Sequence, residues 1–169
     1  AVVDERTGEV LLLCCVTNRP ERGEHRRHLL MASADQGATW SAPRDIGAAV
    51  QDYDDTFVTG PGCGIQMRTG RLVVPGYTSP EVLDGAGERG FRARVLVSDD
   101  HGRTWRLGRA VEADANECQV AERSDGALML NMRQGAGECC RAVALSLDGG
   151  ASWGPVAYDR GLPECPCQA

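Results

Sequence analysis

The chain has 169 residues, of which 42% are hydrophobic, and its formal net charge is −6. This length suffices for one domain with its own core, and the acidic balance argues against nucleic acid as a partner, because nucleic-acid-binding domains are usually basic. The longest purely apolar run, from Val10 to Val16, is much too short to cross a bilayer.

The first third of the chain predicts short strands. The stretch from Glu9 to Val16, which is apolar from Val10 onward, is typical of a strand that is covered on both faces. An arginine-rich stretch from Asn18 to His28 is expected to form a solvated loop. Leu29 to Ala32 predicts a second strand, and Ser41 to Gly47 predicts an edge strand, where its proline is tolerated.

The middle third combines a glycine-rich segment with apolar ones. Thr56 to Gln66 holds three glycines and a proline, a composition that lets the backbone approach a neighbour closely. Strands are expected at Arg71 to Tyr77 and at Phe91 to Ser98, where apolar residues alternate. The stretch from Asp84 to Gly90 is expected to be an inserted loop.

The last third predicts a further set of strands, at Asn116 to Val120, Ala127 to Arg133 and Cys140 to Leu147. In the second of these, three apolar side chains share one face: Leu128, Leu130 and Met132. Because neighbouring side chains of a strand point to opposite faces, Arg133 is expected at the strand end on the other face. No helical periodicity of useful length occurs, so we expect an all-β fold.

One eight-residue pattern occurs three times, at residues 33–40, 98–105 and 146–153. Each copy has the form Ser-x-Asp-x-Gly-x-(Ser/Thr)-Trp. The aspartate accepts hydrogen bonds from amides that follow it, the glycine supplies an unusual backbone conformation, and the tryptophan leaves the turn as an apolar anchor. We therefore expect three hairpin turns that build the scaffold and lie far from any chemistry.

The eight cysteines do not have the spacing of a metal site. Cys14–Cys15 and Cys139–Cys140 are adjacent pairs within predicted strands, so each pair points to two faces. There is no CxxC, and the spacing of Cys165 and Cys167 is poor for zinc. We expect no metal, and small buried thiols that pack the core. Such thiols favour a cytoplasmic or membrane-associated protein over a secreted one.

The repeated pattern is the Asp-box of sialidases, and the order of the remaining motifs resembles that of the animal-type exo-α-sialidases. The resemblance runs through TFVTGPGCGIQ, GRLVVPGY, SDDHGRTW, NECQVAE, LNMR and CQ at Cys167–Gln168. It implies a six-bladed β-propeller. At about 40–50 residues a blade, residues 1–169 hold about three to four blades, so we expect an internal fragment of a longer protein.

The resemblance also implies an activity. Members of the family hydrolyse terminal α-linked sialic acids of glycoproteins, gangliosides or oligosaccharides with net retention, without a metal or an organic cofactor. The expected partners are therefore sialylated glycoconjugates, and no obligate protein partner is inferred.

Three residues take their roles from this resemblance. Sialic acid carries a carboxylate on its anomeric carbon, which would repel a carboxylate nucleophile, and sialidases use a tyrosine instead. Glu117, in NECQ, matches the catalytic glutamate that activates this tyrosine. Arg133, in LNMR, matches the second of three arginines that bind the substrate carboxylate. Tyr77, in VVPGY, matches a tyrosine that lines the sugar pocket.

The remaining catalytic groups of the family are expected outside this chain. The first arginine and the acid/base aspartate would precede it, and the third arginine and the nucleophilic tyrosine would follow it. Neither Tyr53 nor Tyr158 occupies the nucleophile's position, and Asp54 and Asp55 do not match the acid/base loop. We therefore expect the isolated chain to be inactive.

Two alternatives remain open at this point. One is a non-catalytic sialidase-like propeller that binds glycans. The other is a propeller that serves only as a scaffold or a protein-binding surface. Glu117, Arg133 and Tyr77, in matched order, argue against the second alternative, because scaffolding requires none of them.

Overall fold

The computed structural model describes residues 1–16, 27–52, 55–80, 90–135 and 137–163. It contains three antiparallel sheets, here called blades 1 to 3. Blade 1 comprises β1 (Val2–Asp4), β2 (Glu9–Val16), β3 (Arg27–Ser33) and β4 (Arg44–Asp45). Blade 2 comprises β5 (Gln51–Asp52), β6 (Asp55–Thr59), β7 (Ile65–Gln66), β8 (Leu72–Pro80), β9 (Arg92–Ser98) and β10 (Arg106–Leu107). Blade 3 comprises β11 (Ala115–Glu122), β12 (Leu128–Gln134), β13 (Cys140–Ser146) and β14 (Ala157–Pro163).

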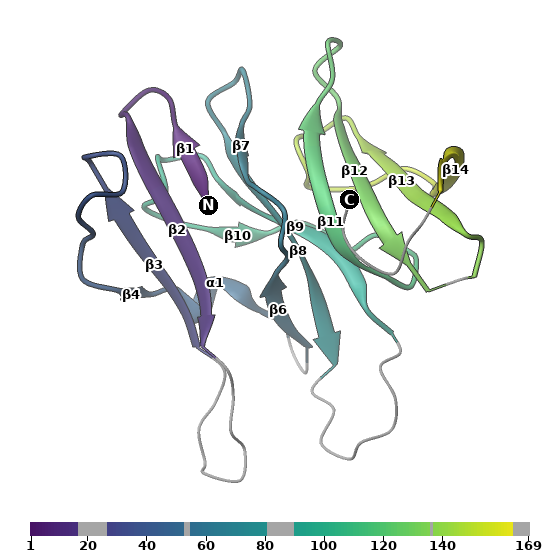
Figure 1. The fold of residues 1–169 in the computed structure, drawn as a ribbon, viewed down its shortest axis with the longest axis horizontal. Coiled ribbons are helices and arrows are strands. Elements are labelled where there is room, and N and C mark those ends of the chain that lie inside the picture. Colours follow the sequence, from purple (N-terminus) through teal and green to yellow (C-terminus); the bar gives the residue numbers. More distant parts are fainter. Residues whose placement is uncertain (17–26, 53–54, 81–89, 136, 164–169) are drawn as a thin grey trace, which may run out of the picture.

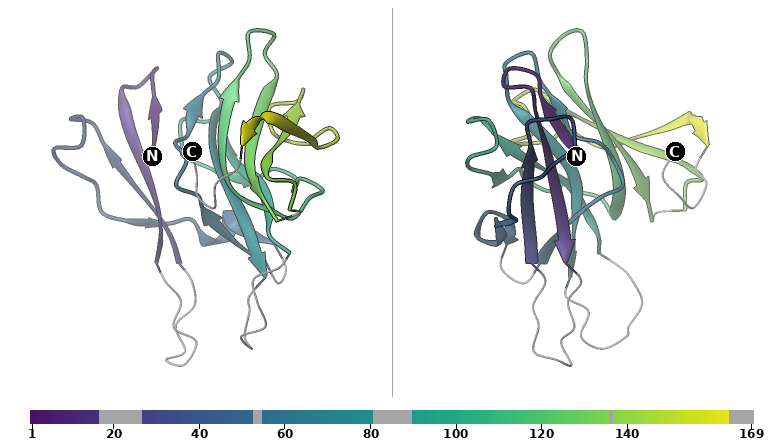
Figure 2. Two further views of the ribbon diagram at one scale, coloured as in Figure 1. Left: turned by 45° about the vertical axis from the view of Figure 1, so that its right-hand side comes forward. Right: turned by 60° about the vertical axis from the view of Figure 1, so that its left-hand side comes forward.

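The blades stand side by side as part of a β-propeller, with blade 2 between the other two (Figure 1). In the left-hand view of Figure 2, blade 1 lies at the left of the molecule and β14, in yellow, lies at the right. One short helix, α1 (Gly47–Val50), joins blade 1 to blade 2. The all-β prediction is confirmed, and within the described residues no helix is long and apolar enough to cross a membrane.

Two hydrophobic clusters hold the blades together. Alternating side chains of β8 and β9 face opposite ways. Val73, Val95 and Val97 pack toward blade 3, whereas Leu72 and Leu96 pack toward blade 1. The middle blade is therefore buried on both faces, and both neighbouring blades depend on it.

Blade 1 differs from its prediction. In β2 the side chains of Leu11 and Leu13 are buried, but Leu12 and Cys14 are only half-buried. The expectation that this strand is covered on both faces is wrong for the described structure, because only one face of blade 1 packs against blade 2. The apolar run alone does not distinguish the two cases.

The glycine-rich segment does bring backbone close to backbone. A Cβ atom added to Gly62 would lie 2.4 Å from the carbonyl oxygen of Cys118 on β11. One added to Gly76 would lie 2.4 Å from the carbonyl oxygen of Val58 on β6. Real Cβ atoms are not found so close to an oxygen, so both positions require glycine. The sequence predicts the close approach at Gly62, whereas Gly76 lies outside the glycine-rich segment.

The three Asp-boxes share one hydrogen-bond pattern. In the first, Ser33 Oγ accepts the Gly37 amide at 2.8 Å, and Asp35 accepts both the amide of Thr39 at 2.8 Å and its hydroxyl at 2.6 Å. The same bonds recur in the second and third boxes. Each box glycine has a positive φ, of 91°, 76° and 89° in chain order. The predicted turns are confirmed.

The tryptophans of the boxes differ in their surroundings. Trp105 is 7% exposed and packs in the core between blades 1 and 2. Trp153 is half-buried, and Trp40 is 39% exposed. The expectation of three apolar anchors is therefore wrong for Trp40, whose side chain has no neighbouring blade to cover it among the described residues.

The described cysteines are free thiols. Cys118 and Cys140 are buried, as expected for packing thiols, but Cys63 and Cys139 are exposed. Cys63 lies in the glycine-rich surface segment, and Cys139 has a positive φ of 55° directly before β13. Several predicted features fall outside the described residues: residues 18–26 of the arginine-rich loop, residues 84–89 of the insertion, Tyr53, Asp54, Cys165 and the Cys167–Gln168 motif.

Candidate functional site

A β-bulge at the start of β11 positions Glu117. Ala115 pairs with Gln134 and Cys118 pairs with Met132, so Asn116 and Glu117 together oppose the single residue Arg133. A bulge of this kind re-aims a side chain at a strand end, and bulges are common beside active sites. The amide of Glu117 donates to the side-chain oxygen of Asn116 at 2.7 Å, which fixes the backbone there.

Glu117 and Arg133 form a partly exposed ion pair. Arg133 Nη1 donates to Glu117 Oε2 at 3.2 Å, and the two side chains are 33% and 29% exposed. The sequence predicted a role for each residue but gave no reason to expect their contact. One guanidinium has five N–H donors, so Arg133 can hold Glu117 and still bind a second carboxylate.

Arg141, on β13, contacts both the backbone of Glu117 and the strand that carries Arg133. It is 4% exposed, and its Nε donates to the side-chain oxygen of Asn131 at 2.6 Å. Its Nη2 lies 3.4 Å from the backbone carbonyl oxygen of Glu117, to which it donates. Burying a guanidinium costs free energy unless its donors are satisfied, so these contacts hold the bulge and the strand in one arrangement.

Neither Asn131 nor Arg141 was assigned a role from the sequence. Asn131 shares the face of Arg133, two positions away on β12, because side chains alternate along a strand. Arg141 is the single charged residue of β13, whose other residues are mostly apolar. This is the signal in the sequence that could have indicated a role for it. Charged side chains are almost never fully buried unless they are paired.

Tyr77, on β8, lies close to this region in the backbone. The buried thiol of Cys118, next to Glu117, donates to the carbonyl oxygen of Gly76, next to Tyr77, at 3.2 Å. The ring of Tyr77 is half-buried and meets Phe91 edge to face, with centroids 5.4 Å apart. The structure therefore places the strands of Tyr77 and Glu117 side by side, while the described ring contact of Tyr77 is with Phe91.

Burial keeps the Cys118 thiol protonated. It raises the pKa of Cys118 to about 12, although the hydrogen bond to Gly76 acts in the opposite direction. A thiol of this kind is a packing group and not a nucleophile. Within the part of the chain that the structure describes, no three His, Cys, Asp or Glu side chains are placed to hold a metal ion.

The Asp-boxes lie at the opposite end of the blades from Glu117. In blade 3, Leu128 pairs with both Ser146 and Glu122, and so the third box adjoins the start of β12. Glu117 and Arg133 adjoin the other end of the same strand. This confirms that the boxes are remote from the candidate site.

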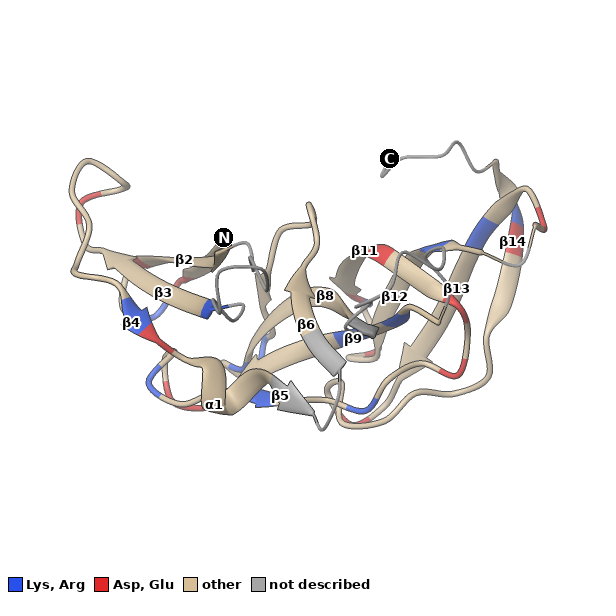
Figure 3. Ribbon diagram, turned by 90° about the horizontal axis from the view of Figure 1, so that it is seen from below, with Lys and Arg blue, Asp and Glu red and all other residues tan. Residues whose placement is uncertain are grey.

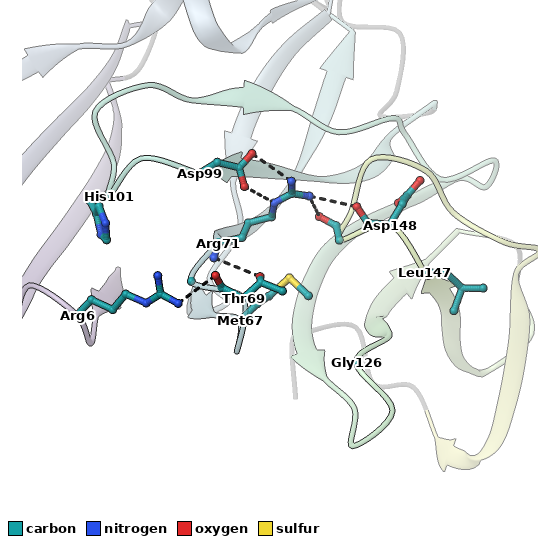
Figure 4. A pocket seen from close by; sticks show the side chains of 11 residues that line it. Arg6, Met67, Thr69, Arg71, Asp99, His101, Gly126, Leu147 and Asp148 are labelled. Atoms are coloured by element: carbon teal, nitrogen blue, oxygen red, sulfur yellow. Dashed lines mark hydrogen bonds and ion pairs between the residues drawn. The ribbon is translucent and has the colours of Figure 1, made fainter.

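A pocket of about 330 Å³ lies among the boxes and is lined partly by Arg71 (Figure 4). The Arg71 guanidinium binds both carboxylate oxygens of Asp99, at 2.6 and 3.1 Å. It also donates to the carbonyl oxygens of Asp148 and Gly149, at 3.1 and 3.0 Å. Arg71 therefore joins the second box to the third, and this explains its position without a role in chemistry.

Charges of opposite sign lie next to each other on the outer strands. Arg44 and Asp45 follow one another on β4, as do Asp159 and Arg160 on β14 (Figure 3). Arg27 contacts Asp45 at 3.1 Å. Exposed pairs of this kind contribute little to stability.

Comparison with known proteins identifies the repeat. The family described as "BNR repeat-like domain" matches residues 1–164. The sialidase of Micromonospora viridifaciens is 43% identical over 139 residues, which cover 78% of this chain and 20% of that protein. Human Sialidase-4 is 40% identical over 148 residues, which cover 79% of this chain and 30% of that protein.

Comparison with a solved structure shows that the fold is also similar to that of a sialidase. The Hadza microbial sialidase Hz136 superposes with a TM-score of 0.80 at 32% sequence identity, over 94% of this chain and 32% of that one. The chain thus spans about a fifth to a third of the length of these relatives. The resemblance to sialidases that the sequence predicts is confirmed over most of the chain.

Proposed function

Because the chain belongs to the BNR repeat-like domain family, we propose that the protein containing it is a retaining exo-α-sialidase. Its substrates are terminal α-linked sialic acids on glycoproteins, gangliosides or oligosaccharides. The observation that carries the proposal is the Glu117–Arg133 pair, 3.2 Å apart in a bulge at the strand ends away from the Asp-boxes. A scaffold propeller needs no such pair.

Glu117 is proposed as the base that activates a nucleophilic tyrosine. A tyrosine hydroxyl has an ordinary pKa of about 10, so at neutral pH it needs a neighbouring group to accept its proton. The carboxylate of Glu117 is 29% exposed, which leaves it accessible to such a hydroxyl. A tyrosine suits this substrate because a carboxylate nucleophile would meet the negative charge of the sialic acid.

Arg133 is proposed to bind the substrate carboxylate. Its planar guanidinium offers parallel N–H donors that match the two oxygens of a carboxylate. In the complete protein the contact with Glu117 would orient this fork and balance its charge. Tyr77 is proposed to line the sugar pocket from the neighbouring blade, because Gly76 and Cys118 join their strands.

The isolated 169-residue chain is proposed to be inactive. Tyr53, Tyr77 and Tyr158 do not occupy the position of the family's nucleophile, and the acid/base aspartate has no counterpart in the sequence. A second candidate function, glycan binding without catalysis, rests on the same Arg133 fork. It would keep the carboxylate contact and lack turnover.

The test is hydrolysis of a fluorogenic α-ketoside of N-acetylneuraminic acid by the full-length protein, with the product followed by NMR. Release of the α-anomer first would support a retaining sialidase. Saturable binding of sialoside without hydrolysis, by a folded protein, would move the assignment to the glycan-binding propeller.

A further inference from the structure

Cys15 and His28 form a side-chain pair outside the proposed sialidase site. They lie directly opposite each other on β2 and β3, so their Cβ atoms are about 5 Å apart on one face. His28 is 4% exposed, whereas Cys15 is half-buried. This face of blade 1 packs against β6, the first long strand of blade 2.

The hydrogen bond from His28 to β6 shows which ring nitrogen carries a proton. His28 Nε2 lies 2.5 Å from the carbonyl oxygen of Phe57. A carbonyl oxygen only accepts, so Nε2 carries a proton and donates it. Nδ1 is then the ring nitrogen through which His28 can interact with the Cys15 thiol, which lies opposite it on β2.

The surroundings favour ionisation of the Cys15 thiol. Burial opposes ionisation of the Cys15 thiol, but hydrogen bonds with His28 and Thr59 outweigh it and lower the pKa from 9.0 to about 7. Cys15 Sγ lies 3.5 Å from Thr59 Oγ1. Cys118, with no imidazole partner, shows the opposite shift.

We propose that Cys15 and His28 form a reactive thiolate–imidazolium site that takes small soft electrophiles, including low-molecular-weight disulfides such as oxidised glutathione. The Cys15 thiolate attacks one sulfur of the disulfide, and a new S–S bond forms as the bond in the reagent breaks. The released thiolate leaves with that electron pair and takes up the proton that His28 held. The product is a mixed disulfide on Cys15 and one free thiol.

Native labelling of the full-length protein with limiting iodoacetamide at pH 7, followed by peptide mass spectrometry, tests this site. Alkylation forms an S–C bond and releases iodide. Cys14 is the matched control, because it adjoins Cys15, is also half-buried and points to the opposite face. A larger thiolate fraction outweighs the lower nucleophilicity of a less basic thiolate, so Cys15 should react at least about fivefold faster than Cys14.

The variant His28→Gln isolates the contribution of the imidazole. Its amide still donates to Phe57 but cannot carry the positive charge, so the Cys15 rate should fall to that of Cys14. In urea the two wild-type cysteines should react alike, which shows that the excess rate belongs to the folded structure. The Cys15→Ser variant should form no mixed disulfide at this position with oxidised glutathione.

Two results would overturn the proposal: a Cys15 rate in the folded wild type no faster than that of Cys14, or an unchanged Cys15 rate in a folded His28→Gln variant. If circular dichroism shows that His28→Gln is unfolded, Thr59→Val replaces it. Loss of that hydroxyl should slow Cys15 by a smaller factor, and an unchanged rate would count against the proposal in the same way.

Discussion

Arg133 Nη1 lies 3.2 Å from Glu117 Oε2, although 16 positions separate the two residues. The contact joins the group proposed to bind a substrate carboxylate to the group proposed to accept a proton. The bulge in β11 makes it possible, because it sets both Asn116 and Glu117 opposite Arg133. Changes to either partner should therefore affect the other, and the experiments below separate their contributions.

Removing the guanidinium that is proposed to bind the substrate carboxylate, in Arg133→Ala, should lower kcat/KM of the full-length protein by about 100- to 1,000-fold and raise KM. The guanidinium binds the carboxylate in both the ground state and the transition state, so its loss weakens both. Steady-state kinetics on a fluorogenic sialoside measure the effect. The control is Arg160→Ala, whose exposed side chain pairs with Glu138 at 3.4 Å and should leave the kinetics unchanged. A variant with normal KM would show that Arg133 does not hold substrate.

Arg141 is predicted to act through Glu117 as a positioning residue. Arg141→Lys keeps the charge but loses the planar contacts with Asn131 and the Glu117 carbonyl. Turnover should fall by about tenfold, whereas in a Glu117→Gln background the same change should have almost no further effect. Full additivity of the two changes in a double-mutant cycle would contradict this role.

Much of the scaffold could be predicted because its signals are local. Each Asp-box satisfies its own hydrogen bonds within eight residues, so the pattern Ser-x-Asp-x-Gly specifies the turn wherever it occurs. The glycine-rich composition around Gly62 likewise indicates a close approach that only glycine permits.

The remaining features depend on partners distant in the sequence. Trp40 and Trp105 occupy the same place in their boxes, yet only Trp105 lies against a neighbouring blade. Leu12 looks as apolar as Leu13, yet its face of blade 1 is only partly covered. The buried contact of Arg141 with Asn131 requires the β12–β13 register, which no local pattern supplies.

The contacts of Arg71 with Asp99 and the third box should contribute more to stability than the exposed contact of Arg106 with the same aspartate. Arg71→Lys loses the two-pronged contact with Asp99 and the bonds to the third box, and should lower the free energy of unfolding by about 1–2 kcal/mol. Arg106→Ala is the matched control, because Arg106 binds the same carboxylate at 3.2 Å from an exposed position. Its cost should stay below about 0.5 kcal/mol. Urea unfolding measures the free energy of unfolding of both variants. An equal loss in the two would contradict the larger contribution of Arg71.

The Asp-boxes should make the protein less stable in acid. The Ser152 hydroxyl and amide hold the pKa of Asp148 at about 2, and Thr39 does the same for Asp35. A lowered pKa means that the stabilisation is present above the ordinary value of 3.8 and is lost as the pH falls toward 2. The free energy of unfolding should drop over this range in urea titrations. The drop should be smaller in Asp148→Asn, and an identical drop would show that this carboxylate does not contribute.

The central claim is that Glu117 accepts a proton during turnover, and Glu117→Gln in the full-length protein tests it most directly. The amide keeps the size of the side chain but cannot act as a base, so kcat on a fluorogenic sialoside should fall by at least about 100-fold. The dissociation constant of a non-hydrolysable sialic acid analogue, measured by calorimetry, should change by less than about threefold, because Arg133 still binds the carboxylate. An unchanged kcat, or a loss of affinity as large as the loss of turnover, would contradict the account.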